Sequence, residues 1–353
     1  MIRETIGKLV EGRSLSFEEA RETMGEIMTG RATDAQIGSF LTALRVKGET
    51  IDEISALASV MRDYCHRINP CVDGRLVDTC GTGGDRVDTF NISTTAAFVA
   101  SGAGVSIAKH GNRSVTSLCG SADVLQGLGL NLALDPGGGK RAIEEGGVGF
   151  MFAPAFHPAM KHAIGPRKEL GIRTVFNILG PLTNPAGASA QLIGVYDPSL
   201  TEPLAKSLER LGSEEAMVVH GLDGMDEIST LGATRLSWLR DGEIKTFEAM
   251  PRDFGVKRAR PEEITGAGPD ESAELTYRIL NDVEGSEDPR TEIVLVNGAA
   301  GIVVGGKADD FLCGMELARE AIGSGAAYAR LRALVKTSGG DTSRLEELED
   351  RYG

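Results

Sequence analysis

Apolar residues recur with the period of an α-helix over the first part of the chain. One run places Phe17, Ala20, Met24 and Ile27 on a single helical face. Three such runs each follow a capping box, in which a hydroxyl side chain and a Glu or Gln three residues later cap the first turn. The three boxes are Ser16 with Glu19, Thr33 with Gln36, and Thr50 with Glu53. This pattern predicts a helical domain over residues 1–70.

The pattern changes after a short polar linker at residues 69–74. Beyond it, brief apolar runs typical of buried strands alternate with runs at helical spacing, as in an α/β domain. Strands are predicted at Leu76–Val77, Val105–Ile107, Val148–Phe152, Leu192–Val195 and Met217–Val219, and helices at Ala96–Ala100, Ala122–Leu128 and Pro203–Leu211. An Asp241–Gly242 pair between two strand-like runs predicts a hairpin.

The fold class predicted from these patterns is α/β. We expect a small N-terminal α-helical domain, residues 1–70, and a large C-terminal α/β domain, residues 71–353, with a central sheet flanked by helices. A helical bundle of this size rarely folds alone, so it should pack on the larger domain or on a second copy of the chain.

Composition and charge narrow the functional class. Of the 353 residues, 41% are hydrophobic and 25% are charged, which is ordinary for a soluble globular protein. A formal net charge of −14 argues against nucleic acid as the main partner, because binding a polyanion needs a basic face. The five cysteines form no C-x-x-C pair and predict reduced intracellular thiols. No signal peptide or long apolar span is recognised, so we expect a cytoplasmic protein with no membrane association.

A stretch rich in glycine and hydroxyl side chains follows the first predicted strand. It runs from Asp78 to Asp85 (DTCGTGGD) and is followed by Asn91–Thr95 (NISTT), which opens a predicted helix. Backbone N–H groups, hydroxyls and a helix N-terminus that face one place form an anion site, most naturally for phosphate. The loop matches neither the Walker A nor the G-x-G-x-x-G fingerprint. An ordinary tight turn is the alternative, but the many donors that follow favour a ligand-binding loop.

A basic stretch follows the strand predicted at residues 105–107. It runs from Lys109 to Ser117 (KHGNRSVTS) and closes on Gly120–Asp123 (GSAD). By itself it could be a solvated surface loop. Ligands of α/β folds, however, gather at the carboxyl ends of strands, and Lys109 and Arg113 would add positive charge there. The two stretches together predict binding of a phosphorylated small molecule.

These stretches resemble those of the anthranilate phosphoribosyltransferases of tryptophan biosynthesis. The motifs that carry the resemblance are GTGGD, NIST, KHGNRS and GSADVL, with the later segments Phe156–His162, Gly165–Arg167, Asn177–Pro185 and His220–Ser229. They occur in the expected order over essentially the whole chain. Thr116 and Cys119 depart slightly, since the family more often has a small residue or serine there.

The resemblance implies a fold, an assembly and a reaction. The fold would be the two-domain arrangement of nucleoside phosphorylases, and the assembly a homodimer formed through the helical domain. The reaction would join anthranilate to 5-phosphoribosyl 1-diphosphate (PRPP), with release of pyrophosphate.

The resemblance also implies roles for individual residues at the matching positions. PRPP would be bound by Gly81, Gly84, Asp85, Thr89, Asn91, Ile92, Ser93, Thr94, Lys109, His110, Gly111, Asn112, Arg113, Ser114, Val115, Thr116, Ser117 and Ser121. Anthranilate would be bound by Gly81, Asn112 and Arg167, and Mg²⁺ would be held by Ser93, Asp226 and Glu227. Hard oxygen ligands suit magnesium, and an arginine fork suits a carboxylate. No general base is assigned.

Two alternatives remain from the residues alone. A nucleoside phosphorylase would share the architecture, although the Asp226–Glu227 pair and Arg167 favour a diphosphate donor and an acidic acceptor. A relative without activity that binds nucleic acid would need a basic surface and degraded loops, which the net charge of −14 and the intact motifs disfavour. We interpret Cys80 and Cys119 as small packing residues, and structural roles for His157 and His162 are at least as well supported as functional ones.

Overall fold

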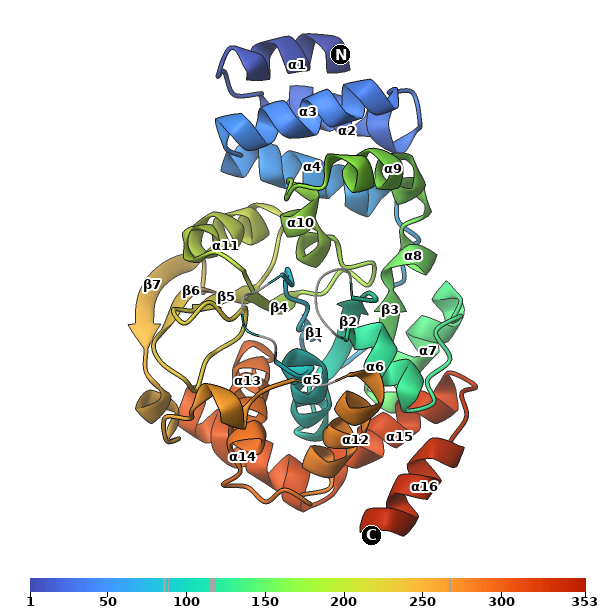
Figure 1. Ribbon diagram of the computed structural model, residues 1–353, viewed down its shortest axis with the longest axis vertical. Coiled ribbons are helices and arrows are strands. Elements are labelled where there is room, and N and C mark those ends of the chain that lie inside the picture. Colours follow the sequence, from blue (N-terminus) through green and yellow to red (C-terminus); the bar gives the residue numbers. More distant parts are fainter. Residues whose placement is uncertain (85–86, 88, 115–118, 267) are drawn as a thin grey trace.

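A layer of helices caps one end of an α/β body in the computed structural model (Figure 1). The structure describes residues 1–84, 87, 89–114, 119–266 and 268–353. The cap contains α1 (Ile2–Val10), α2 (Phe17–Met28), α3 (Asp34–Lys47) and α4 (Ile51–Asp63). The strands of the body are β1 (Leu76–Asp78), β2 (Ser106–Gly111), β3 (Val148–Phe152), β4 (Ala190–Gly194), β5 (Glu215–Gly221), β6 (Thr234–Arg240) and β7 (Glu243–Ala249).

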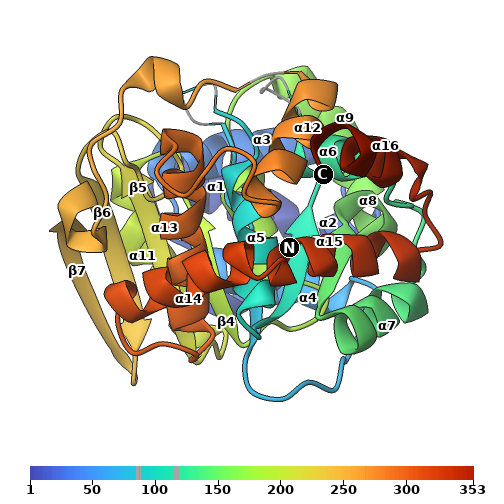
Figure 2. The same ribbon diagram turned by 90° about the horizontal axis from the view of Figure 1, so that it is seen from below.

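The remaining helices lie around the sheet, apart from α9 (Lys161–Leu170), which packs in the cap. They are α5 (Ile92–Gly102), α6 (Ser121–Gly127), α7 (Pro136–Gly146), α8 (Ala153–Phe156), α9, α10 (Phe176–Leu179), α11 (Thr201–Arg210), α12 (Pro269–Leu280), α13 (Pro289–Val304), α14 (Phe311–Gly323), α15 (Ala326–Thr337) and α16 (Ser343–Tyr352), with short 3-10 turns that include η2 (Gly180–Thr183). Seen from below, α14 and α15 cross this end of the molecule, and α16 lies beside α12 (Figure 2). The predicted α/β class with a small N-terminal helical domain is confirmed.

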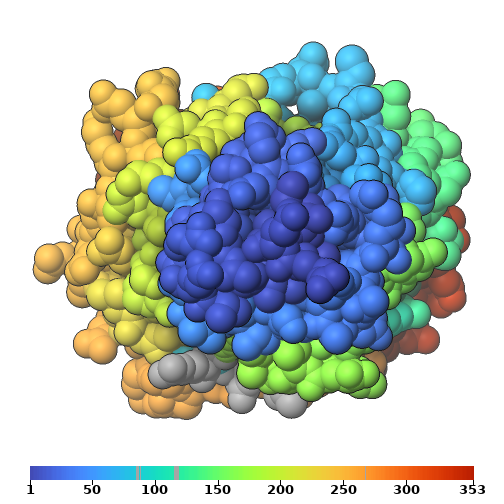
Figure 3. All heavy atoms as spheres, turned by 90° about the horizontal axis from the view of Figure 1, so that it is seen from above, coloured from blue at the N-terminus to red at the C-terminus, as the bar shows by residue number. Residues whose placement is uncertain are grey.

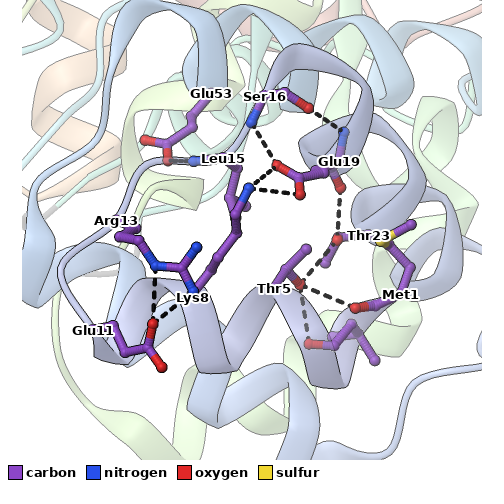
Figure 4. A network of polar contacts seen from close by, with 11 residues as sticks. Met1, Thr5, Lys8, Glu11, Arg13, Leu15, Ser16, Glu19, Thr23 and Glu53 are labelled. Atoms are coloured by element: carbon purple, nitrogen blue, oxygen red, sulfur yellow. Dashed lines mark hydrogen bonds and ion pairs between the residues drawn. The ribbon is translucent and has the colours of Figure 1, made fainter.

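The three predicted capping boxes are present at the starts of α2, α3 and α4. At α2, the Glu19 amide donates to Ser16 Oγ at 3.2 Å, and the Ser16 amide donates to Glu19 Oε2 at 2.8 Å. The same Glu19 carboxylate pairs with Lys8 of α1 at 2.7 Å, and the hydroxyls of Thr5 and Thr23 meet at 3.1 Å (Figure 4). One capping residue therefore also ties α1, which no capping box predicted, to α2.

Glu53 plays a second structural role inside the cap. Its side chain is fully buried and accepts hydrogen bonds from the amides of Leu15 and Thr50, each at 2.8 Å. Lys47, whose side chain is 6% exposed, pairs with Glu53 at 2.8 Å. The carboxylate thus joins the end of α3, the start of α4 and the loop before α2.

Replacing Glu53 with Ala is expected to lower the free energy of unfolding by about 3 kcal/mol, because Lys47 and two buried amides would lose their partner. Urea unfolding followed by circular dichroism would measure the change. Glu11→Ala is the matched control, since Glu11 pairs with Arg13 while both side chains are more than half exposed. That change should cost less than about 0.5 kcal/mol. Equal losses in the two variants would contradict the role of the buried pair.

The sheet has the order β3-β2-β1-β4-β5-β6-β7. Strands β3, β2, β1, β4 and β5 run parallel, and Val77 at the centre is in register with Ile107 on one side and Ala190 on the other. All five predicted strands are confirmed, with small differences at their ends. The predicted hairpin joins β6 and β7, and its Asp241 and Gly242 have φ of 53° and 74°, as a type I′ turn requires.

Alternating side chains of the central strands feed two hydrophobic cores. In β5, Met217 and Val219 face the core shared with α5 and α13. Ala216 and Val218 face the other core, which continues through α11 into the helices of the cap. Since the cap and the body share this core, the expectation that the bundle packs on the larger domain is confirmed.

Helix α9 lies in the cap although it is distant from the other cap helices in sequence (Figure 1). It packs against α2 and α3, with Ala163 fully buried in their common core and Leu170 beside Gly38. Figure 3 shows this face from above, with the N-terminal helices over its centre. A domain boundary at residue 70 assigns α9 to the larger domain by its place in the sequence, although α9 packs against α2 and α3. Among the described residues, none of the helices combines the length and hydropathy of a membrane-spanning segment.

Candidate functional site

The carboxyl ends of β1 and β2 bring the two predicted phosphate-binding stretches together. Lys109 lies in β2, and only 4% of the residue is exposed. Its Nζ donates to the carbonyl of Thr79 at 3.1 Å, to the Thr79 hydroxyl at 3.2 Å and to Ser93 Oγ at 3.5 Å. The ammonium group therefore lies between the glycine-rich loop and the first turn of α5, where an anion would also meet the positive end of the helix.

Two of the three predicted metal ligands are in contact, and the third lies at the glycine-rich loop. The Ser93 amide donates to Glu227 Oε1 at 3.1 Å, although the two residues are 134 positions apart. Asp226 approaches the glycine-rich loop so closely that a Cβ on Gly81 would lie 3.2 Å from Asp226 Oδ2. A Cβ on Gly194, at the end of β4, would overlap the Asp226 carbonyl. Glycine at these positions lets Asp226 reach the loop.

The chemistry of this trio fits a magnesium ion. All three side chains offer hard oxygen atoms, which Mg²⁺ prefers over nitrogen or sulfur. Burial raises the pKa of Asp226, while a hydrogen bond from the Gly83 amide opposes that shift. A bare carboxylate is costly to bury, so a cation beside Asp226 would stabilise its charged form.

The glycine-rich loop is held from several sides. Gly83 and Gly84 have φ of 65° and 75°, a left-handed conformation that favours glycine. The Thr82 amide donates to the Gly194 carbonyl at 2.8 Å, and Thr82 Oγ1 accepts from the Tyr196 amide at 3.2 Å. The Arg173 guanidinium also donates to the Gly84 carbonyl. The sequence did not predict this role of Arg173. The residue lies 89 positions from Gly84 and belongs to none of the motifs to which we assigned a ligand.

The basic stretch is organised by Asp123 at the start of α6. Its carboxylate accepts from the Ser114 amide at 3.2 Å and from the Gly120 amide at 3.0 Å. It also pairs with the Arg113 guanidinium at 2.6 Å, and a second guanidinium nitrogen donates to Gln126. Arg113, which we expected to add positive charge to the site, is therefore engaged in holding the loop.

One further contact joins the two stretches, and others act within the basic stretch. The Asn91 side chain donates to the Cys119 carbonyl at 3.2 Å, and Ser121 Oγ donates to the Asn112 carbonyl at 3.3 Å. A Cβ on Gly111 would clash with Ser121 Oγ. Asn112 itself is exposed.

The other predicted PRPP-binding positions fall into three groups. Ile92 and Thr94 are buried in α5. Thr89 forms a β-bridge with Thr265. Four positions lie outside the residues that the structure describes, namely Asp85, Val115, Thr116 and Ser117.

Two buried histidines lie on the other side of Lys109. The rings of His110 and His157 are 5.0 Å apart, and His110 Nδ1 lies 3.3 Å from the Gly180 carbonyl. In the part of the chain that the structure describes, Nε2 of each ring is buried without a hydrogen-bond partner. Burial lowers the pKa of His110 to about 3 and that of His157 to about 4, so both are neutral near pH 7. Orphaned buried nitrogens of this kind suit a polar ligand.

Arg167 approaches the same segment from α9. Its guanidinium lies 5.1 Å from the ring centroid of Phe176 in α10, and burial lowers its pKa. Since α10 leads directly into Gly180, Arg167 and the histidine pair flank one short stretch of chain. Arg167 and two histidines thus flank residues 176–180: His110, which the resemblance assigns to PRPP, and His157, whose role the sequence left open.

Asp78, at the end of β1, fixes the backbone of His110 and the side chain of Asn184. The sequence did not predict this structural role. Asp78 is fully buried, and it accepts from the His110 amide at 3.1 Å and from the Asn184 side chain at 2.7 Å. Burial raises the pKa of Asp78 to about 6. Asp78, Cys80 and His110 place ligand atoms within 4.8 Å of one another. A metal is disfavoured there, because Asp78 already serves protein donors and burial raises the pKa of the Cys80 thiol.

Sequence families match both parts of the chain. Residues 3–65 match the helical bundle domain of a glycosyl transferase family, and residues 73–328 match the a/b domain of that family. An anthranilate phosphoribosyltransferase of Acetivibrio thermocellus is 53% identical over 336 residues, which cover 95% of this chain and 96% of the relative. One of Methanocorpusculum labreanum is 50% identical over 340 residues, which cover 96% and 99%.

Solved structures agree with these matches. The anthranilate phosphoribosyltransferase of Thermus thermophilus superposes with a TM-score of 0.88 at 42% identity, covering 94% of this chain and 98% of that chain. The enzyme of Saccharomyces cerevisiae in complex with PRPP and Mg superposes with a TM-score of 0.87 at 28% identity, covering 96% and 98%.

Proposed function

Because the chain belongs to the anthranilate phosphoribosyltransferase family, we propose that it transfers the 5-phosphoribosyl group of PRPP to the amine of anthranilate. The products are N-(5-phosphoribosyl)anthranilate and pyrophosphate, in a step of L-tryptophan biosynthesis. One observation above all supports this proposal: Lys109 joins the glycine-rich loop to Ser93, Asp226 lies at that loop, and Glu227 accepts from the Ser93 amide. A cationic side chain, a helix N-terminus and a hard-oxygen cation site are what a diphosphate ester requires.

The residues around Lys109 would act on the leaving group. As pyrophosphate departs from the anomeric carbon, the sugar gains oxocarbenium character and negative charge accumulates on the diphosphate. Lys109, the loop amides and the first turn of α5 are placed to stabilise that charge. Ser93, Asp226 and Glu227 would hold Mg²⁺, which supplies further positive charge to the diphosphate when bound.

The residues around Arg167 would orient the acceptor. Its guanidinium can pair with the anthranilate carboxylate through two parallel hydrogen bonds. The neutral rings of His110 and His157 each offer an Nε2 that has no hydrogen-bond partner among the described residues. The aromatic amine is already unprotonated near pH 7, so it needs placement near the anomeric carbon more than a general base.

A fluorescence assay tests this function. Purified protein, anthranilate, PRPP and Mg²⁺ are mixed, and the loss of anthranilate fluorescence is followed together with released pyrophosphate. We expect a loss that requires both PRPP and the metal. No loss from folded protein, with phosphate-dependent cleavage of a nucleoside instead, would favour a nucleoside phosphorylase.

We also propose that the protein is a homodimer formed through the helical domain, residues 1–70. A groove of about 900 Å³ crosses this cap between α1, α3 and α9. Its lining includes Leu9, Val10, Val46 and Leu170, and Val10 and Val46 are 73% and 82% exposed. Apolar side chains gathered on one exposed face are typical of a surface that another protein covers.

Replacing Val46 with Glu is expected to convert a dimer into a monomer, because the charge would be buried without a partner at the interface. Sedimentation velocity at micromolar concentration would detect the change, the chain mass being 37.3 kDa. Leu312→Glu on α14 is the matched control, since Leu312 is 57% exposed and lies outside the cap. A monomeric wild type, or a dimer unaffected by Val46→Glu, would contradict the proposed interface.

A cytoplasmic location is proposed on the basis of the cysteines. All five are free thiols, and Cys71 and Cys313 are exposed. Exposed free thiols persist in a reducing compartment. Cell fractionation that recovers the protein outside the soluble fraction would contradict this location.

A further inference from the structure

Arg173 connects the cap to the glycine-rich loop. It lies in the short segment between α9 and α10, six positions after Arg167. Its guanidinium donates to the carbonyl of Gly84, the last described residue of the GTGG run. A single chain segment therefore carries both the predicted anthranilate residue and a direct contact to the predicted PRPP loop.

The arginine is held in this position by an aromatic ring. The centre of its guanidinium lies 4.2 Å from the ring centroid of Tyr196, a distance typical of cation–π stacking. Tyr196 follows β4, and its amide donates to Thr82 Oγ1 at 3.2 Å. One residue at the end of β4 thus supports both the loop and the arginine that contacts it.

The Arg173 contact fixes a part of the loop that has no side chains of its own, residues 83 and 84. Gly83 and Gly84 both have positive φ and carry no side chain that could pack. Thr82 is fixed by the end of β4, and the Gly83 amide is fixed by Asp226. Arg173 adds a hydrogen bond to the next carbonyl along the chain. A hydrogen bond from a charged donor is stronger than one from a neutral donor, so the contact limits the positions that this carbonyl can occupy.

Arg173 also brings positive charge to the site. It is close enough to Asp226 for its charge to favour the ionised carboxylate. The guanidinium has five N–H donors, more than the Gly84 contact uses. It is exposed, so a ligand at the loop could reach it.

We propose that Arg173 is a positioning residue for PRPP: it holds the Gly84 carbonyl so that the loop amides face the diphosphate. This inference rests on the proposed function, because it takes PRPP as the ligand of the loop. Arg173 follows α9, the helix that carries the predicted anthranilate residue Arg167. The geometry of the PRPP loop would therefore depend on the position of α9.

Calorimetric titration with PRPP in the presence of Mg²⁺ and the absence of anthranilate tests the proposal. Arg173→Ala is expected to weaken PRPP binding at least about tenfold, the usual effect of losing a hydrogen bond from a charged group. In steady-state assays the KM for PRPP should rise by a similar factor, while the KM for anthranilate changes less than about threefold. The melting temperature should be unchanged, because the lost side chain is exposed.

Arg45→Ala is the matched control. Arg45 is an exposed arginine whose charge also acts on Tyr196, but the described residues show no hydrogen bond from it to the loop. It should leave PRPP binding unchanged. If Arg173→Ala and Arg45→Ala weakened PRPP equally, or neither did, the positioning role would be refuted.

A second pair of variants acts through Tyr196. Tyr196→Leu removes the ring that holds Arg173 and should weaken PRPP binding in the same direction as Arg173→Ala. Tyr196→Phe keeps the ring and should bind PRPP as the wild type does. Equal binding by both Tyr196 variants would overturn the proposed support of Arg173. A wild-type protein that binds no PRPP would instead refute the proposed function, so the two failures are distinguishable.

Discussion

Replacing Asp226 with Asn together with Glu227 with Gln is expected to lower kcat at least about 1,000-fold. The Asp226 carboxylate lies at the glycine-rich loop and the Glu227 carboxylate at the first turn of α5, and their charges would hold the cation that balances the diphosphate. The amides keep the size of the side chains and one acceptor oxygen in each, while removing two negative charges. The effect should therefore fall on turnover, and the fold should survive.

The measurement is the anthranilate fluorescence assay over a range of Mg²⁺ concentrations, with circular dichroism to check folding. Glu243→Gln with Glu248→Gln, on strand β7 at the edge of the sheet, changes the charge by the same amount and is expected to leave kcat unaltered. Chelation of the metal from the wild type should reproduce the loss. Near-normal magnesium-dependent turnover in the double variant would show that the metal is held elsewhere.

Arg167→Ala is expected to raise the KM for anthranilate about 30- to 100-fold and the KM for PRPP by less than about threefold. A bidentate pair between a guanidinium and a carboxylate is among the stronger polar contacts in proteins, and Arg167 is partly removed from solvent. The predicted phosphate-binding loops lie on the body, whereas Arg167 comes from α9 in the cap. The loss should therefore be selective for the acceptor.

Steady-state kinetics with each substrate varied in turn measures the two constants. Lys168→Ala is the matched control, since Lys168 is the next residue of α9 and is exposed. It should leave both constants unchanged. Arg167→Lys should recover only part of the affinity, because lysine keeps the charge but lacks the planar fork. Equal increases in both KM values for Arg167→Ala would contradict a role specific to anthranilate.

Most of the fold could be predicted because its determinants are local. The capping boxes at Ser16, Thr33 and Thr50 involve residues three positions apart, and each starts a helix as predicted. The Asp241–Gly242 hairpin depends on two adjacent residues with positive φ. Apolar runs predicted the strands for the same reason, since parallel strands buried on both faces need apolar side chains at successive positions.

The position of α9 could not be predicted in this way. Its sequence contains both Gly165 and Pro166, and its pattern does not say which surface it covers. Its place in the cap follows from the shared core with α2 and α3. The extent of the cap is therefore decided by packing.

In the candidate site, too, the local features were predicted and the long-range contacts were not. Its loops were recognised because glycine, hydroxyl and basic residues cluster within short stretches, and the resemblance suggested their ligands. The engagement of Arg113 by Asp123, the anchoring of His110 by Asp78, and the Arg173 contact could be found only in three dimensions.

The sequence by itself determined three helix starts, the strands, the two candidate ligand loops and the family of this protein, because each is encoded by residues close together in the chain. Only the tertiary structure decided which of these residues meet. Ser93 contacts Glu227 across 134 positions, Asn184 contacts Asp78 across 106, and Arg173 contacts Gly84 across 89. Such distances are closed by the strand order of the sheet and by the core that the cap and body share. No local pattern encodes them, because the burial that drives them is a property of the whole packed chain.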